Sequence, residues 1–283
     1  MRFEYVEPRT VGEAVSFLSA YDGKAKIIAG GTDLINLIQS KSIRPDYVVD
    51  IACIPGLDYV KYDGKGDLFI GVLTTIRTLE VSAEVKKRHP VIAQAARRLG
   101  SVAIRNVGTI GGNLCHASPA AETAPSLIAL GARVKIVGPM EERTLALEDF
   151  FIGPGQTVLR RGEMMVEIQV PAMQPHTKGV YLKHSIRGPA DLAIVGVAAV
   201  ATCDPERCEE VRIALGAVAP TPIRARNAEE ALEGKQIDGR LIETAARAAS
   251  DQSRPITDLR ASAGYRKEMV KVFTRSAIRE IFG

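Results

Sequence analysis

Hydrophobic and polar residues follow short, regular patterns in the N-terminal part of the chain. Thr10 is followed three positions later by Glu13, which is the spacing of a helical capping box. The apolar positions of the helix that this predicts are Val11, Ala14, Val15 and Leu18. An apolar run at 26–29 predicts a strand, residues 34–39 predict a short helix, and residues 47–50 predict a second strand. The simplest arrangement of these elements is a compact β-α-β unit.

The pattern changes near Pro55, where a second group of short elements begins. The strands and helices expected there are 57–61, 68–71, 75–84 (helix), 91–99 (helix), 124–130 (helix) and 133–137. Val166, Ile168 and Val170 alternate with polar residues, which predicts a half-buried strand that ends at a proline. His89 precedes a proline at the start of an expected helix, and we expect it on the surface.

The C-terminal part changes from strand-like to helix-like texture. The strands expected first are 179–185, 193–202 and 211–218, and the helices that follow are 228–232, 242–250 and 265–281. This order predicts a small sheet covered by helices, which is an α+β arrangement. We therefore place a domain boundary near Met173, with one domain at 1–173, divided into lobes at about 1–54 and 55–173, and a second at 174–283.

Composition and charge exclude some function classes. The net charge is +4 with scattered basic residues, and aromatic residues are only 5% of the chain with no Trp. Nucleic-acid binding favours clustered basic residues interleaved with aromatics, so the composition argues against it. The N-terminal residues lack the basic start and apolar core of a signal peptide, and no apolar run approaches membrane-spanning length. We expect a cytoplasmic protein without a transmembrane segment.

The cysteines do not form a recognisable scaffold. Cys53, Cys115, Cys203 and Cys208 are too few and too widely spaced for a disulfide framework. Cys203 and Cys208 lie near each other in sequence, but no second pair and no nearby His completes a metal site. We expect buried or surface thiols, with no metal site and no iron–sulfur cluster in this chain.

Two glycine-rich segments are the candidate chemical feature. The first, at 26–34, runs from strand through Gly30-Gly31 into a helix, and the second, at 105–119, is expected as a loop between two helices. Glycine lets backbone N–H groups approach a ligand, so two such segments predict a site for two phosphates. A side chain at Gly30 or Gly111 is then expected to occupy a phosphate's place. The alternative is a pair of tight turns. Neither a G-x-G-x-x-G nor a Walker lysine motif is present, so Rossmann and P-loop mechanisms are not supported.

These segments resemble a known family. AGGTD at 29–33 and GTIGGN at 108–113 are similar to the two pyrophosphate loops of the FAD-binding medium subunits of molybdenum hydroxylases, the xanthine, carbon monoxide and nicotinate dehydrogenase group. The similarity continues through 117–122, 162–165, Lys183 and 191–193, and so covers nearly the whole chain. It implies a two-lobed FAD-binding domain of the vanillyl-alcohol-oxidase (PCMH) type, followed by a C-terminal α+β domain of the carbon monoxide dehydrogenase flavoprotein type.

The resemblance also implies a set of FAD-binding residues. They are Lys26, Ile27, Ile28, Ala29, Gly30, Gly31, Thr32, Asp33, Leu34, Ile104, Val107, Gly108, Thr109, Ile110, Gly111, Gly112, Asn113, Cys115, Ser118, Pro119, Glu122, Met165, Lys183 and Leu192. Ser118 and Glu122 are expected to bind ribityl or adenosine hydroxyls, although Glu122 could instead cap a helix. Met165 and Leu192 are expected to line the flavin ring, although ordinary core packing is the alternative. Lys183 is expected near the flavin's polar edge, where a cation favours the anionic reduced form.

The sequence contains no recognisable nucleophile–base pair, so we expect no catalytic residue and assign the redox chemistry to FAD. The resemblance implies that a small subunit with two [2Fe–2S] clusters and a large molybdopterin subunit are partners, as a dimer of heterotrimers. FAD then passes electrons to an external acceptor, which is NAD⁺, oxygen, a quinone or a carrier. Two alternatives remain: a non-catalytic assembly protein that has kept the fold, and a stand-alone FAD oxidoreductase. The organic substrate is not encoded in this chain.

Overall fold

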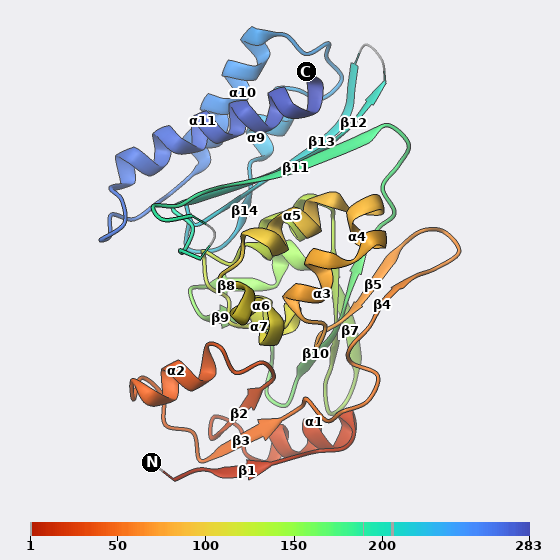
Figure 1. Ribbon diagram of the computed structural model, residues 1–283, viewed down its shortest axis with the longest axis vertical. Coiled ribbons are helices and arrows are strands. Elements are labelled where there is room, and N and C mark those ends of the chain that lie inside the picture. The colour runs from red at the N-terminus through yellow and green to blue at the C-terminus, as the bar shows by residue number, and fades with distance from the viewer. Residues whose placement is uncertain (1, 189, 205–206) are drawn as a thin grey trace.

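The computed structural model describes residues 2–188, 190–204 and 207–283, which form three tiers along the long axis (Figure 1). The N-terminal tier is a parallel sheet of order β1-β3-β2 with two helices. Its elements are β1 (Glu4–Val6), α1 (Val11–Ala20), β2 (Ala25–Ile28), α2 (Leu34–Gln39) and β3 (Tyr47–Asp50). The predicted β-α-β unit is present, and β1 adds a strand that the sequence pattern did not indicate.

The capping box at the start of α1 forms largely as expected. Thr10 Oγ1 accepts a hydrogen bond from the Glu13 backbone N–H at 3.1 Å. The Glu13 carboxylate reaches back to the Arg9 N–H at 2.7 Å, one residue before the cap. Two backbone donors at the helix start are therefore satisfied by side chains, and this fixes where α1 begins.

The middle tier contains an antiparallel sheet of order β4-β5-β10-β6-β7 and a small β8-β9 hairpin. The strands are β4 (Val60–Tyr62), β5 (Leu68–Gly71), β6 (Arg133–Val137), β7 (Glu142–Ala146), β8 (Phe151–Gly153), β9 (Gln156–Thr157) and β10 (Met164–Val170), with a 3₁₀ turn at Leu147–Asp149. β10 lies at the centre of the sheet because its apolar side chains are buried.

Helices cover one side of this sheet, and two expectations about them are wrong. The helices are α3 (Ile76–Val81), α4 (Ala83–Arg88), α5 (Pro90–Arg98), α6 (Val102–Val107), α7 (Ile110–Cys115) and α8 (Thr123–Ala129). The single helix expected at 75–84 is divided because Ser82 leaves the helical conformation and its Oγ caps α4. The loop expected at 105–119 contains parts of α6 and α7, since Ser101 and Thr109 act as N-caps.

His89 is buried, so the surface position expected for it is wrong. The ring lies at the α4–α5 junction, with Nε2 3.0 Å from the Pro171 carbonyl oxygen and Nδ1 3.2 Å from the Tyr62 hydroxyl. The carbonyl can only accept, so Nε2 carries the proton and Nδ1 accepts from Tyr62. Burial lowers the pKa of His89, which keeps the ring neutral.

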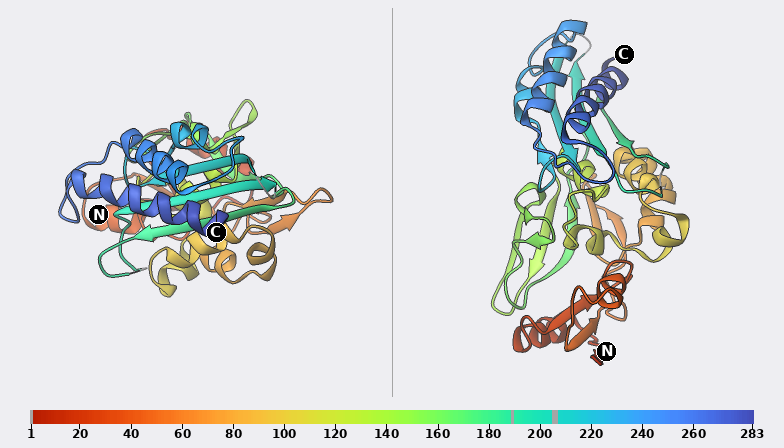
Figure 2. Two further views of the ribbon diagram at one scale, coloured as in Figure 1. Left: turned by 90° about the horizontal axis from the view of Figure 1, so that it is seen from above. Right: turned by 90° about the vertical axis from the view of Figure 1, so that its left-hand side faces the viewer.

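The C-terminal tier is an antiparallel sheet of order β11-β12-β13-β14 with three helices. Its elements are β11 (Thr177–His184), β12 (Val195–Asp204), β13 (Arg207–Gly216), β14 (Ile223–Arg224), α9 (Arg226–Glu230), α10 (Gly239–Gln252) and α11 (Ala263–Phe282). The three helices cover the outer face of the sheet, and α5 and α8 of the middle tier lie against the inner face (Figure 2). This is the small helix-covered sheet that the sequence predicted.

Hydrophobic packing explains this arrangement. Buried residues of β12 alternate between two clusters: Ala198 and Val200 join the cluster of the lower two tiers, while Val197 and Ala199 join the cluster beneath α10 and α11. Both faces of the sheet therefore pack against hydrophobic residues. Within the described residues, no helix is long and apolar enough to cross a bilayer, and no group of three or more His, Cys, Asp or Glu side chains is arranged to hold a metal ion.

Candidate functional site

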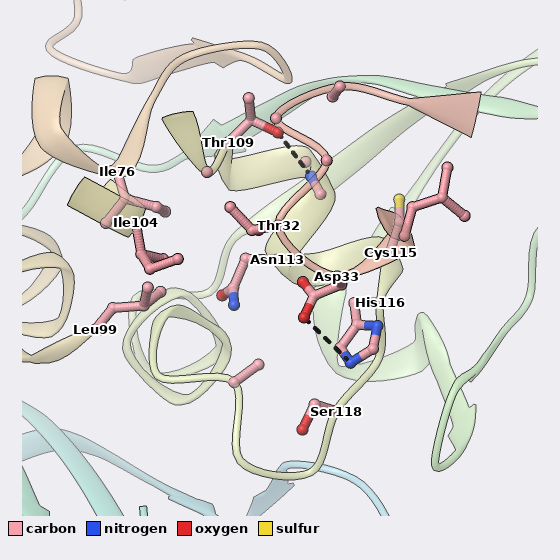
Figure 3. Close-up of a pocket in the computed structure, with 18 of the residues that line it drawn as sticks. Thr32, Asp33, Ile76, Leu99, Ile104, Thr109, Asn113, Cys115, His116 and Ser118 are labelled. Carbon is pink, nitrogen blue, oxygen red and sulfur yellow. Dashed lines mark hydrogen bonds and ion pairs between the residues drawn. The ribbon is translucent and has the colours of Figure 1, made fainter. Parts of the chain in front are cut away.

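A cavity of about 420 Å³ lies where the N-terminal tier meets the middle tier and the segment that precedes β12. Its floor and walls come from the β2–α2 segment, from α6 and α7, from β10 and from residues 190–192. Figure 3 shows its lining, with Thr32 and Asp33 from the first segment opposite α7. Segments distant in the chain thus converge on a single site.

Most of the residues implied by the resemblance line this cavity. They are Ile27, Ile28, Ala29, Gly30, Gly31, Thr32, Asp33, Leu34, Ile104, Gly108, Thr109, Gly111, Gly112, Asn113, Cys115, Ser118, Glu122, Met165 and Leu192. The residues of that set that do not contribute to the lining are Lys26, Val107, Ile110, Pro119 and Lys183. The lining residues outside the predicted set are Leu37, Ile51, Val72, Ile76, Leu99, Gly100, His116, Ala120, Ala121, Leu159, Met164, Ala190 and Asp191.

The first glycine segment supplies unpaired backbone donors. Considering all described residues, none of the N–H groups of residues 30–34 donates a hydrogen bond within the chain. The α2 helix begins at Leu34, so these amides include those that a helix start leaves without intrahelical partners. They line the cavity and are available to an anionic ligand.

The second glycine segment differs from the expectation that it too offers free amides. The N–H groups of Ile110 and Gly111 donate to the carbonyls of Thr74 and Val72 at 2.9 and 3.0 Å. The Gly112 N–H donates to Thr109 Oγ1 at 3.1 Å, a contact drawn in Figure 3. The middle sheet and the N-cap thus satisfy these donors. In the described structure, the Thr109 N–H is the amide of residues 108–113 that has no acceptor.

Gly30 and Gly111 are needed for packing within the protein, whereas we expected a side chain at either position to occupy the place of a phosphate. A Cβ added at Gly30 would lie 1.9 Å from the Val107 carbonyl oxygen, and one at Gly111 would lie 2.6 Å from Val72 Cβ. A side chain at either position would therefore collide with the protein itself before it met a phosphate. A Cβ at Gly112 meets only Thr109 Oγ1, at a tight 3.0 Å, so the protein confines this position less than Gly30 or Gly111.

Three polar side chains add donors to the cavity. The half-buried Thr32 hydroxyl has no partner among the described residues. Asn113 Oδ1 accepts from the Thr123 hydroxyl at 2.5 Å, which orients the side chain and leaves its NH₂ group to donate. Ser118 Oγ accepts from the Ala120 N–H at 3.2 Å, and its proton is free to donate. Hydroxyl and amide donors suit phosphate and sugar oxygens.

Apolar side chains form the remaining walls. Ile76, Leu99 and Ile104 group on one side of the cavity, away from the polar Asp33 and His116 (Figure 3). Met164 and Met165 both line the cavity although they are neighbours in β10. Neighbours in a regular strand point to opposite faces, and these two pair in regular register with Val137 and Ile136 of β6, before the β-bulge that follows Met165. Simple alternation could therefore not identify both methionines.

Carboxylates in the lining lie beside compensating groups. Asp33 Oδ1 lies 3.8 Å from His116 Nε2. Arg187, 3.5 Å from Asp191, holds the pKa of that carboxyl below its usual range. The described lining contains no Lys or Arg, so amides and hydroxyls would hold a phosphate here. Burial raises the pKa of the Cys115 thiol to about 12, so this residue stays neutral.

A buried ion pair lies directly behind the cavity. Lys183 Nζ is 2.7 Å from Glu122 Oε1, and the two side chains are only 1% and 6% exposed. The same ammonium donates to the carbonyl oxygens of Arg98 at 2.8 Å and Asp191 at 2.5 Å. Burial raises the pKa of Glu122, and Lys183 opposes this effect. Glu122 makes no side-chain capping bond to α8, so it acts as an ion-pair partner and not as the expected alternative cap.

Arg105 fixes a second wall. Its guanidinium binds Glu80 at 2.8 Å and donates to the carbonyl oxygens of Leu99 at 3.0 Å and Gly100 at 2.7 Å. Burial alone would raise the pKa of Glu80, but hydrogen bonds from Arg77 and Arg105 lower it below its usual value. The turn that carries Leu99 and Gly100 into the cavity is therefore tied to α3.

The arrangement as a whole suits one kind of ligand. Free amides and hydroxyls are clustered in one part of the cavity, and apolar side chains line another. This fits a diphosphate joined to a largely apolar ring, and the fold and the site together define a protein that binds a dinucleotide cofactor outside the Rossmann class.

Comparison with known proteins identifies the family. The model of the FAD-binding domain in molybdopterin dehydrogenase matches residues 1–173, and that of the carbon monoxide dehydrogenase flavoprotein C-terminal domain matches residues 180–281. The chain belongs to the FAD-binding medium subunits of the molybdenum hydroxylases. This confirms the family, the fold class and FAD as the cofactor, all of which the resemblance implied.

The chain is similar to its relatives over its whole length. It is 34% identical to the glyceraldehyde dehydrogenase medium chain of Sulfolobus acidocaldarius, covering 99% of this chain and 98% of the relative. It is 35% identical to the carbon monoxide dehydrogenase medium chain of Hydrogenophaga pseudoflava, covering 98% and 96%. A solved structure of that organism's carbon monoxide dehydrogenase superimposes with a TM-score of 0.96 at 36% identity, covering 99% and 96%. Quinoline 2-oxidoreductase from Pseudomonas putida superimposes with a TM-score of 0.92 at 30% identity, covering 100% and 97%.

Proposed function

We propose that this chain is the FAD-bearing electron-transfer subunit of a molybdenum hydroxylase complex. Electrons arrive from [2Fe–2S] clusters in a small partner subunit, which receives them from a large molybdopterin subunit. They leave through FAD to an external acceptor such as NAD⁺, oxygen, a quinone or a carrier. Support comes from the family and from the related carbon monoxide dehydrogenase of Hydrogenophaga pseudoflava, an enzyme with a molybdenum cofactor that was solved in a form lacking the Mo-pyranopterin moiety of that cofactor. The assembly we propose is a dimer of heterotrimers.

The cavity next to residues 30–34 is the observation that carries the assignment of the site. In this proposal the unpaired amides of that segment, with Thr32, Asn113 and Ser118, hold the diphosphate. Met165 and Leu192, which line the cavity, would contact the ring. Bound FAD supplies reversible acceptance of two electrons. We also propose residues 1–173 and 174–283 as the two domains.

The first test is a visible absorption spectrum of the purified chain, with the acid-released cofactor identified by chromatography. We expect about one FAD per chain, because the chain matches one FAD-binding domain, and no iron–sulfur bands. A colourless chain that also fails to take up added FAD would contradict the proposal and favour the assembly-protein alternative.

The second test addresses the partners. We expect the tagged chain, purified from its own organism, to bring with it proteins that contain molybdenum and iron. Substrate added to that complex should bleach the flavin absorption. A chain that oxidises a reductant through FAD equally fast without partners would instead support the stand-alone oxidoreductase.

A further inference from the structure

Two cysteines face each other across the β12–β13 hairpin, in a part of the molecule that the FAD-binding site does not use. Cys203 on β12 pairs directly with Cys208 on β13, and both are free thiols. This end of the hairpin lies at the top of Figure 1, whereas α2, α6 and α7 lie in the lower half. Neither cysteine lines the FAD cavity.

The backbone hydrogen bonds identify the kind of pair. The Cys203 N–H donates to the His176 carbonyl at 3.3 Å, and the Cys208 N–H donates to the Lys235 carbonyl at 3.0 Å. Neither N–H bonds to the opposite cysteine, so the two form a non-hydrogen-bonded antiparallel pair. Regular pairs of this kind have Cα atoms about 4.5 Å apart and side chains on the same face of the sheet, and here a β-bulge between Thr202 and Cys203 lies directly beside the pair. Disulfides span Cα distances of about 4.4–6.8 Å, so this pair lies within their reach.

The surroundings of the two thiols differ. Both pack in the hydrophobic cluster beneath α10 and α11, where Cys208 is fully buried and Cys203 is half-buried. Burial raises the pKa of Cys203, although nearby Lys178 opposes this, and burial raises the pKa of Cys208 to about 12. Cys203 is therefore the thiol that an oxidant in solvent reaches first.

We propose that Cys203 and Cys208 form a dithiol site that closes to a cross-strand disulfide when a hydroperoxide oxidises the protein. The Cys203 thiolate attacks one peroxide oxygen, the O–O bond breaks, and with hydrogen peroxide the product is a sulfenic acid and water. The Cys208 thiolate then attacks that sulfur, the S–S bond forms, and the S–O bond breaks to release a second water. The cysteines lose two electrons and two protons, and the peroxide gains them.

The sequence between the cysteines provides a direct assay. Arg207 is a trypsin site, so Cys203 falls in the tryptic peptide 188–207 and Cys208 in 208–212. The folded full-length protein is treated with hydrogen peroxide and then denatured in the presence of N-ethylmaleimide, which blocks free thiols. It is then digested with trypsin without reductant. We expect the two peptides to be recovered as one cross-linked species that dithiothreitol separates. Because the thiolates react, the rate should rise as the pH is raised.

Controls separate this proposal from non-specific oxidation. A sample unfolded before oxidation should also give disulfides to Cys53 and Cys115, whereas the folded protein should give only the hairpin pair. In Cys208→Ser, Cys203 should remain a sulfenic acid that dimedone traps. Separate N-ethylmaleimide adducts on both peptides after oxidation of the folded wild type would overturn the proposal. FAD content is measured in parallel, so a failure of the disulfide and a failure of the flavin assignment are distinguishable.

Discussion

Removing the ammonium of Lys183 should damage the protein far more than removing an exposed lysine from a similar pair. Lys183→Met leaves Glu122 as a buried carboxylate without its cation, and it deprives two carbonyl oxygens of a donor. Breaking a buried ion pair in this way costs about 3–5 kcal/mol of unfolding free energy. The matched control is Lys135→Met, whose ion pair with Glu142 has the same chemistry but side chains 35% and 58% exposed. It should cost less than about 1 kcal/mol.

The buried charge makes two further results diagnostic. Adding Glu122→Gln to Lys183→Met removes the unpaired carboxylate, so the double variant should regain roughly 2 kcal/mol over the single one. Without Lys183, only burial and local hydrogen bonding act on Glu122, and its folded-state pKa rises further above the unfolded value. The folded state then favours the protonated carboxyl. Lys183→Met should therefore lose stability as the pH rises above the usual range of a carboxyl pKa, with no such trend in Lys135→Met.

The same variants test what Lys183 does for the flavin. Its contacts to Arg98, Glu122 and Asp191 hold three segments whose adjacent residues line the cavity, so FAD content should fall in Lys183→Met and stay unchanged in Lys135→Met. The measurements are denaturant unfolding by circular dichroism across pH, and flavin released per chain. Equal stability of the single and double variants would refute the reasoning. A shifted flavin potential with unchanged FAD content would favour the electronic role instead.

Two other predictions follow from contacts at the cavity. Gly111→Ala should lower the unfolding free energy by about 1–3 kcal/mol, because its Cβ would overlap Val72. Gly112→Ala should lower the thermal midpoint much less, because its Cβ meets only Thr109 Oγ1, and it should lower FAD content, because Gly112 lines the cavity. An equal decrease of the thermal midpoint in Gly111→Ala and Gly112→Ala would contradict this prediction. Because the folded-state pKa of Glu80 is lowered, its contribution to stability is present above about pH 4 and is lost as the pH falls. In Arg105→Met, the unfolding free energy should therefore fall less steeply as the pH is lowered. Identical pH profiles in the variant and the wild type would exclude the Arg105–Glu80 pair as a cause of acid unfolding.

The elements that the sequence predicted well are those whose signals are local. The Thr10 cap and the spacing of apolar residues after it predicted α1, and the apolar run before Gly30 predicted β2. Both signals depend on residues a few positions apart, which propensity and capping describe. The first glycine segment was likewise predicted as strand, glycines and helix, and the structure has that order.

Features that depend on distant partners could not be predicted in this way. The α6 and α7 helices are six residues each, and such short helices have little intrinsic stability. α7 forms because its first N–H groups bond to the carbonyls of Val72 and Thr74, nearly forty positions earlier in the chain. His89 is buried because its two ring nitrogens hydrogen-bond to Tyr62 and Pro171, which lie far from it in the sequence. No local pattern contains this information.

The two glycine segments look alike in sequence, but their backbone N–H groups have different partners in the structure. In the first, the N–H groups of residues 30–34 have no acceptor among the described residues, and Gly30 lets this segment lie against the Val107 carbonyl of the second. In the second, the amides of 110–113 bond to the protein, which fixes α7 in place and aims Asn113 at the cavity. One segment thus presents unpaired N–H groups to the cavity, and the other holds α7 in place. Glycine is needed at Gly30 and at Gly111 because both positions lie against other parts of the protein, the Val107 carbonyl in the first case and Val72 in the second.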